Sequence, residues 1–459
     1  MPARMEFRLD LGPAVDRSDR SARTRGPMRL LVLGDFSGRA AADRPPLAER
    51  PTHRVDLDRL DPLMKRLAPR LVLPGGALHF EQLDDFHPDA LYARFGPFDA
   101  LRRARAEPAA AGTDLLGALL GKPAASAPAA AGRAAPAAGI DAFIHGIVAP
   151  HIAADPAPQA QGLRAAVDAA SAEPMRQLLH DPAFQALESA WRGVQWLVSG
   201  LELDEHLELH LFDVTRDELL ADVVAAQGRL AQTGLHCALA DRWRNGPDRQ
   251  GWSALVGLLR FGPGDTDIGL LAALGLIAAQ AGGPLLAAGD PALAGAAATD
   301  PALAGWQALR RSEAAPWIGL AAPRVLLRRP YGRGSDPITA FSFEEMVGTP
   351  AHETLLWGNP GLAVALLIGR AFSARGWAFE PGDEREIGDL PAYTFAQDGE
   401  QVLQPCAETW LGDEAAQAWL DAGLMPLLSH RHRHAVTVMR LQSVAAPAQA
   451  LAGLGARSG

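Results

Sequence analysis

Cysteine is scarce in this chain, and long apolar runs are missing. Cys237 and Cys406 are the only cysteines among 459 residues, and neither lies in a CxxC pair. This excludes a disulfide framework and a thiolate zinc site. The longest stretch without a polar side chain or proline, residues 268–279, is well short of the roughly 20 residues that span a bilayer. The start, MPARMEFRLDLG, has no apolar signal-peptide core, so we expect a cytoplasmic protein without membrane insertion.

Lysine is also rare, and the overall charge is negative. Only Lys65 and Lys122 occur among 43 basic residues, which we interpret as a codon-composition bias. The net charge of -10 argues against a general nucleic-acid surface. Hydrophobic residues make up 48% and charged residues 21% of the chain, as in a globular protein with room for two to four domains.

The composition divides the chain into blocks. Residues 1–105 form a first unit, and residues 106–140 are rich in alanine and proline, which is typical of a flexible linker. Residues 141–440 form a second, larger unit. Residues 441–459 are predicted to be a flexible tail.

Strand and helix patterns alternate in both units. The first unit is expected to hold strands at 6–11, 30–33, 71–73 and 78–80, and helices at 57–67 and from residue 88. In the second unit, residues 207–211 predict a strand with one buried face, and Thr215 with Glu218 predicts a capping box. Helices are expected at 266–282 and 363–372, and buried strands at 318–320 and 325–327. This order predicts an α/β (α+β mixed) protein with mixed β-sheets flanked by helices.

The segment LLHDPAFQALESAWRG, residues 178–193, carries the most information. Asp181 is a plausible N-cap and Pro182 suits the first helical position. Phe184, Leu187 and Trp191 then recur at helical spacing, which favours a packed core face.

This segment closely resembles the large subunit, TssC, of the type VI secretion contractile sheath. Further words of the second unit resemble the same family, among them LFDVTRDELLADV at 211–223, FSFEE at 341–345 and LLWGNP at 355–360, which contains Trp357. The first unit resembles the small sheath subunit, TssB, through LVLGDFSGR at 31–39, PPLAERP at 45–51 and LDDFHPDAL at 83–91. The chain thus looks like a natural fusion of a TssB-like part and a shortened TssC-like part, lacking the usual C-terminal sheath domain.

The resemblance implies a structural component of a type VI-like contractile apparatus, without enzymatic activity or cofactors. The partners it implies are copies of itself, other sheath subunits, an inner-tube protein, baseplate components and a ClpV-type ATPase. Residues 140–153 lie where that ATPase grips the family, although a helix docked on its own domain is the alternative. Because the C-terminal domain is expected to be missing, an adaptor, cap or baseplate-linked accessory that cannot polymerise by itself is a second hypothesis.

Two groups of residues are candidate interfaces. The strand carrying Phe7, Leu9 and Leu11 could add to a sheet edge in a neighbouring protomer, as in the family, or form an edge strand of its own domain. The charged residues inside the family-like words could fix subunit register by complementary charge, an interpretation favoured over acid/base chemistry. They are Glu188, Arg192, Arg310, Arg311, Glu344 and Glu345.

Catalytic motifs are weak. LGDFSGR follows a strand but lacks the G-K-[ST] ending of a phosphate loop, so Asp35 is interpreted as a turn residue. His430, His432 and His434 would share one face of a strand and could hold zinc in a metal-dependent enzyme, a remote alternative to a basic, exposed or inter-subunit strand. We predict no catalytic, cofactor-binding or metal-ligating residue.

Overall fold

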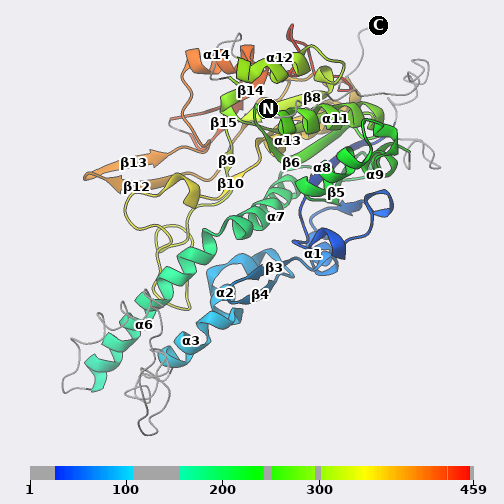
Figure 1. The fold of residues 1–459 in the computed structure, drawn as a ribbon. Coiled ribbons are helices and arrows are strands. Elements are labelled where there is room, and N and C mark those ends of the chain that lie inside the picture. The colour runs from blue at the N-terminus through cyan, green and yellow to red at the C-terminus, as the bar shows by residue number, and fades with distance from the viewer. Residues whose placement is uncertain (1–25, 107–155, 242–250, 295–300, 432, 455–459) are drawn as a thin grey trace. The chain divides into compact units, whose positions relative to one another are not determined.

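The computed structural model describes residues 26–106, 156–241, 251–294, 301–431 and 433–454 (Figure 1). The chain divides into two compact units. The sheet unit comprises residues up to Pro69, Ala186–Arg328 and from Leu356 onward. The helical unit comprises Arg70–Gln185 and Arg329–Leu355. Each unit therefore combines segments from both sequence blocks.

A nine-stranded mixed sheet is the framework of the sheet unit, in the order β11-β15-β14-β8-β7-β6-β1-β5-β2. The six strands from β14 to β5 run parallel, and antiparallel strands close both edges. The strands are β1 Met28–Gly34, β2 His53–Val55, β5 Leu207–Asp213, β6 Ala254–Phe261, β7 Leu285–Gly289, β8 Ile318–Ala322, β11 Glu386–Ile387, β14 Leu424–Ser429 and β15 Val436–Val438.

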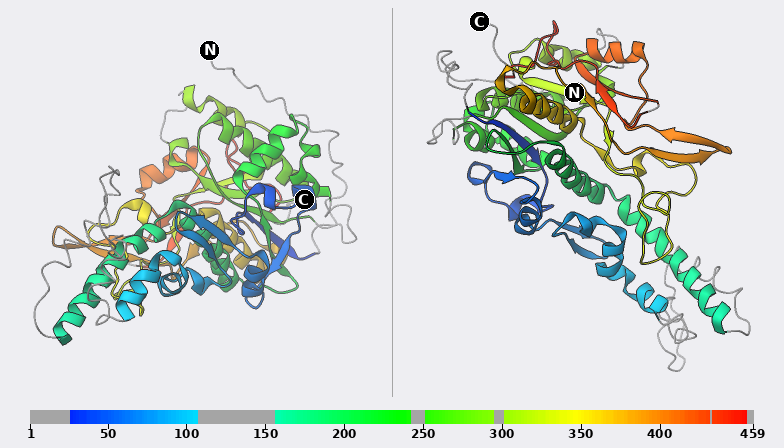
Figure 2. Two further views of the ribbon diagram at one scale, coloured as in Figure 1. Left: turned by 60° about the horizontal axis from the view of Figure 1, so that its bottom comes forward. Right: turned by 180° about the vertical axis from the view of Figure 1, so that it is seen from behind.

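Helices cover both faces of this sheet, as the views in Figures 1 and 2 show. On one face, α8 (Arg216–Ala225), α11 (Asp265–Ala281) and α12 (Ala304–Arg310) share a buried cluster with Leu31 and Leu33 of β1. On the other face, α13 (Pro360–Arg375) contacts β6, β7 and β8. The alternation of side chains along β1 thus supplies apolar groups to two helical layers.

The remaining elements of the sheet unit are short. They are helices α1 Leu60–Leu67, α9 Gly234–His236 and α14 Asp413–Asp421, the strand pair β9 Val325–Leu326 and β10 Trp357–Gly358, and the hairpin β12 Tyr393–Gln397 and β13 Glu400–Gln404. Helix α7, Pro182–Gly200, belongs to the sheet unit from Ala186 onward.

The helical unit is built around an aromatic core. Its elements are the hairpin β3 Arg70–Leu73 and β4 Gly76–His79, and helices α2 Pro88–Arg94, α3 Asp99–Ala106 and α6 Pro156–Leu179. Phe80 stacks on Phe86 with ring centroids 4.2 Å apart, and both rings meet Phe184 edge-on. Phe341, from the irregular segment 329–355, packs on Tyr92 at 4.7 Å.

The predicted class, an α/β fold with a large mixed sheet flanked by helices, is confirmed. Local signals are confirmed as well. The Asp181 carboxylate accepts hydrogen bonds from the backbone N–H groups of Ala183 and Phe184 at the start of α7, and Thr215 and Glu218 form the capping box of α8.

Two expectations are wrong. Residues 441–454 are not a flexible tail: Val444, Ala445 and Leu451 are buried, and the Val444 N–H donates to the Ile318 carbonyl. Strand β5 is buried on both faces rather than one: on the face expected to be exposed, Phe212 joins the buried cluster with α8 and His210 packs against Trp252, and α13 also contacts the strand.

Candidate functional site

The two sequence blocks meet within the sheet unit, where a strand of the first block is inserted into the sheet of the second. Strand β1, from the first block, lies between β5 and β6 of the second block and runs parallel to both. All seven residues of β1 have register partners on β5, from Met28 opposite Leu207 to Gly34 opposite Asp213. The second block's sheet would therefore be split in two without this strand.

The carboxyl end of β1 is tied to the carboxyl end of β5. One oxygen of the Asp213 carboxylate accepts hydrogen bonds from the backbone N–H groups of Phe36 and Ser37, at 2.8 and 3.0 Å. The other oxygen accepts the Ser37 hydroxyl at 2.6 Å. Asp35 accepts the Gly38 N–H, so the LGDFSGR segment is a strand end followed by a turn, as predicted.

A buried ionic cluster extends this junction. Arg44 contacts Asp35 at 2.5 Å and Glu218 at 2.8 Å, and its Nε lies 3.7 Å from Asp213. Arg50 contacts Glu218 at 2.8 Å and donates to the Asp213 carbonyl at 2.6 Å. We call these five residues the junction cluster. Both arginines come from the first block, and Asp213 and Glu218 come from the second.

Electrostatics in the junction cluster favour the charged forms of Arg44 and Glu218, whereas burial raises the pKa of Asp35. Burial acts to lower the pKa of Arg44, but the charges of Asp213, Asp35 and Glu218 outweigh it, and its pKa is raised. Burial acts to raise the pKa of Glu218, but hydrogen bonds from Arg50 and Thr215 and the nearby arginine charges lower it. Arg44 and Arg50 are thus ion-paired with Glu218, and the cluster connects the two sequence blocks.

Trp191 completes the junction from α7. Its indole N–H donates to the Phe36 carbonyl at 2.9 Å, and its ring meets the Phe36 ring edge-on at 5.5 Å. Both side chains are fully buried. Trp191, in the WRG motif of the second block, is thus in direct contact with Phe36, in the DFSG motif of the first block.

The helical unit contains a second junction. The Asp89 carboxylate, from α2, accepts hydrogen bonds from the Thr339 N–H and hydroxyl and from the Ala340 N–H. These bonds lower the pKa of Asp89 although burial acts to raise it. Arg105 of α3 pairs with Asp168 of α6 at 2.7 Å. Here too, residues of the first block are held by residues of the second.

Several charged residues predicted as interfaces have partners inside the chain. Glu188 is fully buried and binds Arg192 at 2.7 Å and Arg328 at 2.8 Å. Glu345 is buried and accepts the Tyr331 N–H. The prediction that Glu188 and Glu345 contact another chain is therefore corrected, because both carboxylates are buried and have partners within their own chain.

Arg310 and Arg311 differ although they are adjacent. Arg310 is buried and donates to the carbonyls of Val444 and Asp421, so it holds the C-terminal segment in place rather than an interface. Arg311 and Glu344 are exposed and stay predictions as contacts. The apolar residues of the family-like words, Phe184, Leu187, Trp191 and Trp357, are buried.

Three predicted segments cannot be compared with the structure. The strand with Phe7, Leu9 and Leu11, residues 107–140 of the predicted linker, and residues 140–153 lie outside the described residues, whereas Ala106 ends α3. Within the described helices, none is long and apolar enough to cross a membrane.

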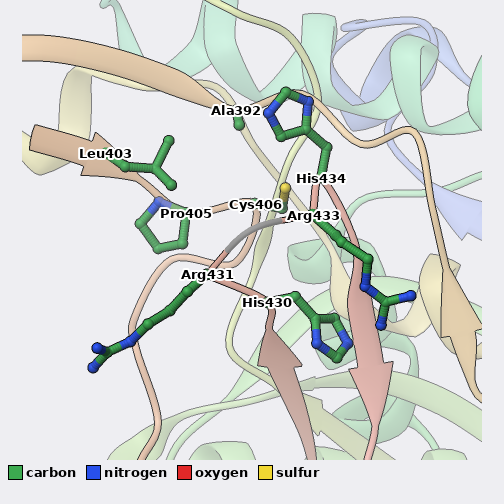
Figure 3. A pocket seen from close by; sticks show the side chains of 8 residues that line it. All are labelled: Ala392, Leu403, Pro405, Cys406, His430, Arg431, Arg433 and His434. Carbon is green, nitrogen blue, oxygen red and sulfur yellow. The ribbon is translucent and has the colours of Figure 1, made fainter.

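The described residues of the histidine-rich segment do not lie in a strand, contrary to the expectation. β14 ends at Ser429 and the antiparallel β15 begins at Val436, and His430, Arg431, Arg433 and His434 lie between them (Figure 3). His430 lies 2.7 Å from the Thr437 hydroxyl and 3.7 Å from Glu386. Among described residues, which leave out His432, no group of three or more His, Cys, Asp or Glu could hold a metal ion.

The junction cluster was missed as a site from the sequence. Arg50 lies within PPLAERP and Asp213 lies within LFDVTRDELLADV, so each was visible only as part of a family-like segment, and Arg44 directly precedes PPLAERP. Their contacts join positions more than 160 residues apart, and no local spacing reveals such pairing.

Comparison with known proteins matches the two blocks separately. Residues 162–445 match the family described as VipB: EvpB/VC_A0108, tail sheath N-terminal domain. Residues 5–127 match the family described as Type VI secretion system, VipA, VC_A0107 or Hcp2.

A curated relative agrees with these matches. The chain is 30% identical over 310 residues to the type VI secretion system sheath protein TssC1 of Pseudomonas aeruginosa. The similarity covers 63% of this chain and 62% of the length of that protein. Since more than half of the chain matches the first family, the chain belongs to the VipB-type tail sheath family of type VI secretion and carries a VipA-type match ahead of it.

Proposed function

We propose that this chain is a structural subunit of a type VI-like contractile sheath, in which the small and large sheath parts are joined in one polypeptide. The observation that supports this most directly is the position of β1 between β5 and β6. A strand hydrogen-bonded on both sides is part of the core, so the VipA-like part acts as a component of the VipB-like sheet.

Joining the parts has a physical advantage. A linker within residues 106–140 converts pairing of the two parts into an intramolecular event at high effective concentration. We therefore propose that the parts at 1–105 and 141–440 pair as one protomer. Other sheath subunits, an inner-tube protein, baseplate components and a ClpV-type ATPase are its proposed partners, in the cytoplasm, and its role requires no catalysis.

Electron microscopy tests the sheath role. The purified chain is imaged by negative stain with and without a type VI inner-tube protein. We expect tubes or rings of regular width. Small dispersed particles under both conditions, with a cooperative unfolding transition showing that the chain is folded, would contradict a self-sufficient sheath and favour the adaptor hypothesis.

A split chain tests the pairing. Cutting the gene between residues 127 and 162 and co-expressing both parts should give fragments that co-purify in equal amounts. Val32→Asp, which places a carboxylate at a fully buried position of β1, should abolish co-purification. Leu57→Asp, at a position that is 68% exposed, is the matched control and should leave it intact.

A further inference from the structure

A small pocket lined by apolar and basic residues lies at the base of the β12–β13 hairpin (Figure 3). Its volume is about 200 Å³. Its apolar lining residues are Ala392, Leu403, Pro405 and Cys406, and its other lining residues are His430, Arg431, Arg433 and His434. We call this the basic pocket.

The cations of the basic pocket are incompletely neutralised by the described residues. Arg433 forms a two-pronged pair with Glu386, at 2.7 and 2.9 Å. Arg431 makes no ion pair among the described residues, and its guanidinium lies over the Trp410 ring, 5.9 Å from the centroid. Trp410 is 41% exposed. Arginine next to an exposed tryptophan is the composition that dominates binding energy at protein interfaces.

The tip of the hairpin carries the opposite charge. Asp398 and Gly399 both have positive φ, 52° and 85°, and form the two-residue turn that joins β12 to β13. Asp398 and Glu400 are exposed, and neither makes an ion pair within the described part of the chain. The tip therefore presents two carboxylates to solvent.

Hairpin length prevents the tip from reaching the basic pocket of its own chain. Four residue steps separate Tyr393 at the base from Gln397 beside the tip, which corresponds to about 14 Å of strand. The basic pocket includes residues at the base, Ala392 and Leu403. The carboxylates at the tip can fill such a pocket only in another copy.

We propose that the acidic hairpin tip of one copy docks in the basic pocket of a second copy. This inference rests on the proposed function, because a sheath repeats one contact between many copies. The contact is heterologous: it joins two different surfaces and leaves a free tip and a free pocket at opposite ends, so it can propagate. It also covers a two-stranded hairpin, an element that is marginally stable when isolated.

Charge reversal tests the contact in full-length chains. Self-association is measured by sedimentation for the wild type, for a tip variant (Asp398→Arg with Glu400→Arg) and for a pocket variant (Arg431→Glu with Arg433→Glu). Each variant by itself should associate at least tenfold more weakly, because its tip and its pocket carry like charges. An equimolar mixture of the two should regain wild-type association, because each tip then meets a pocket of opposite charge.

A matched control separates this contact from a change of net charge. Glu202→Arg with Glu205→Arg reverses two exposed charges elsewhere and should leave association unchanged. The milder tip variant Asp398→Asn with Glu400→Gln should also weaken association. Thermal unfolding of every variant shows that it is folded.

Cross-linking supplies independent evidence. A chain with Glu400→Cys and Arg431→Cys should form a ladder of disulfide-linked multimers on oxidation, whereas one with Glu205→Cys and Arg431→Cys should not. Of the native cysteines, Cys406 is buried and Cys237 is half-buried, and burial raises the pKa of both thiols, that of Cys406 to about 11, which disfavours the reactive thiolate.

Three results would overturn the inference. They are unchanged association of the tip variant, a mixture of folded variants that does not recover, and a wild-type chain that stays a single copy at all concentrations. Tubes formed by wild type and tip variant alike would refute this contact while the sheath function stands. Failure of the sheath function itself shows separately, as dispersed particles in electron microscopy with the inner-tube protein.

Discussion

The indole N–H of Trp191 donates to the carbonyl of Phe36 across 155 residues of sequence. The donor lies in the second block of the chain, on a helix that covers the sheet, and the acceptor lies in the turn that follows β1. A buried donor and a buried acceptor satisfy each other here, and the two rings pack edge-on. Through this contact, the sheath-like motifs around Phe36 and Trp191 pack in the same core.

Replacing Trp191 by phenylalanine should weaken the fold. Trp191→Phe keeps an aromatic ring but leaves the buried Phe36 carbonyl without this donor, which costs about 1–3 kcal/mol of unfolding free energy. Urea unfolding measures the loss. Trp410→Phe, at a half-exposed tryptophan, is the control and should change stability by less than about 0.5 kcal/mol. Equal effects at both positions would show that the hydrogen bond contributes nothing.

Removing Arg44 should be severe. Arg44→Met leaves the carboxylates of Asp213 and Glu218 buried with less compensating charge, and breaking a buried ion pair from one side costs about 3–5 kcal/mol. The comparison is Arg59→Met, whose partner Asp56 lies three residues away on an exposed surface. Guanidinium unfolding of both variants checks the prediction. A loss no larger for Arg44→Met than for Arg59→Met would contradict it.

Acid should loosen the junction cluster through Glu218. Because the pKa of Glu218 is lowered in the fold from its ordinary value of 4.5, the stabilisation is complete above that pH. It is lost as the pH falls through the folded-state pKa, where both states bind the proton. The stability advantage of the wild type over Glu218→Gln should therefore shrink below about pH 4.5. An advantage independent of pH from 7 to 3 would rule this out.

The glycine of the WRG word permits a close helix crossing. A Cβ at Gly193 of α7 would lie 2.5 Å from Leu362 Cδ1 of α13, and Leu362 is fully buried. Gly193→Ala should cost about 1–3 kcal/mol through overpacking, and adding Leu362→Ala should make the combined loss smaller than the sum of the single losses. At Gly162 of α6 nothing lies within 4 Å of the added Cβ, so Gly162→Ala should be neutral or stabilising. Thermal unfolding of Gly193→Ala, Leu362→Ala, the double variant and Gly162→Ala measures these losses. Additive losses in the double variant would contradict the proposed helix contact.

Arg310 should control access to the C-terminal segment. Arg310→Met removes the donors to the Val444 and Asp421 carbonyls and should expose residues 441–454 to proteases. Limited proteolysis followed by mass spectrometry would locate the cuts. Arg311→Met, at the exposed neighbouring position, should leave the digestion pattern unchanged. The same pattern for both variants would show that the segment is held by its apolar residues instead.

Local elements were largely determined by the sequence. The caps at Asp181 and Thr215, the continuous apolar run of β1 and the long helix α11 follow from chemistry within a few residues of each position. The α/β class follows from the order of these elements. The resemblance to sheath proteins also rested on short contiguous motifs, which can be recognised without knowledge of the tertiary structure.

The tertiary structure decided which elements meet. The alternation in β5 predicts one buried face, but Phe212 packs in the cluster with α8 and His210 packs against Trp252, so the second face is buried as well. Glu188 and Arg310 look like surface charges in the sequence, and only folding supplies their partners, Arg328 and the Val444 carbonyl. Hydrogen bonding between strands uses backbone groups common to all residues, so nothing in the sequence of β1 states that its neighbours lie some 180 and 225 residues away. The sequence determined the parts, and long-range packing determined that two blocks make a single sheet.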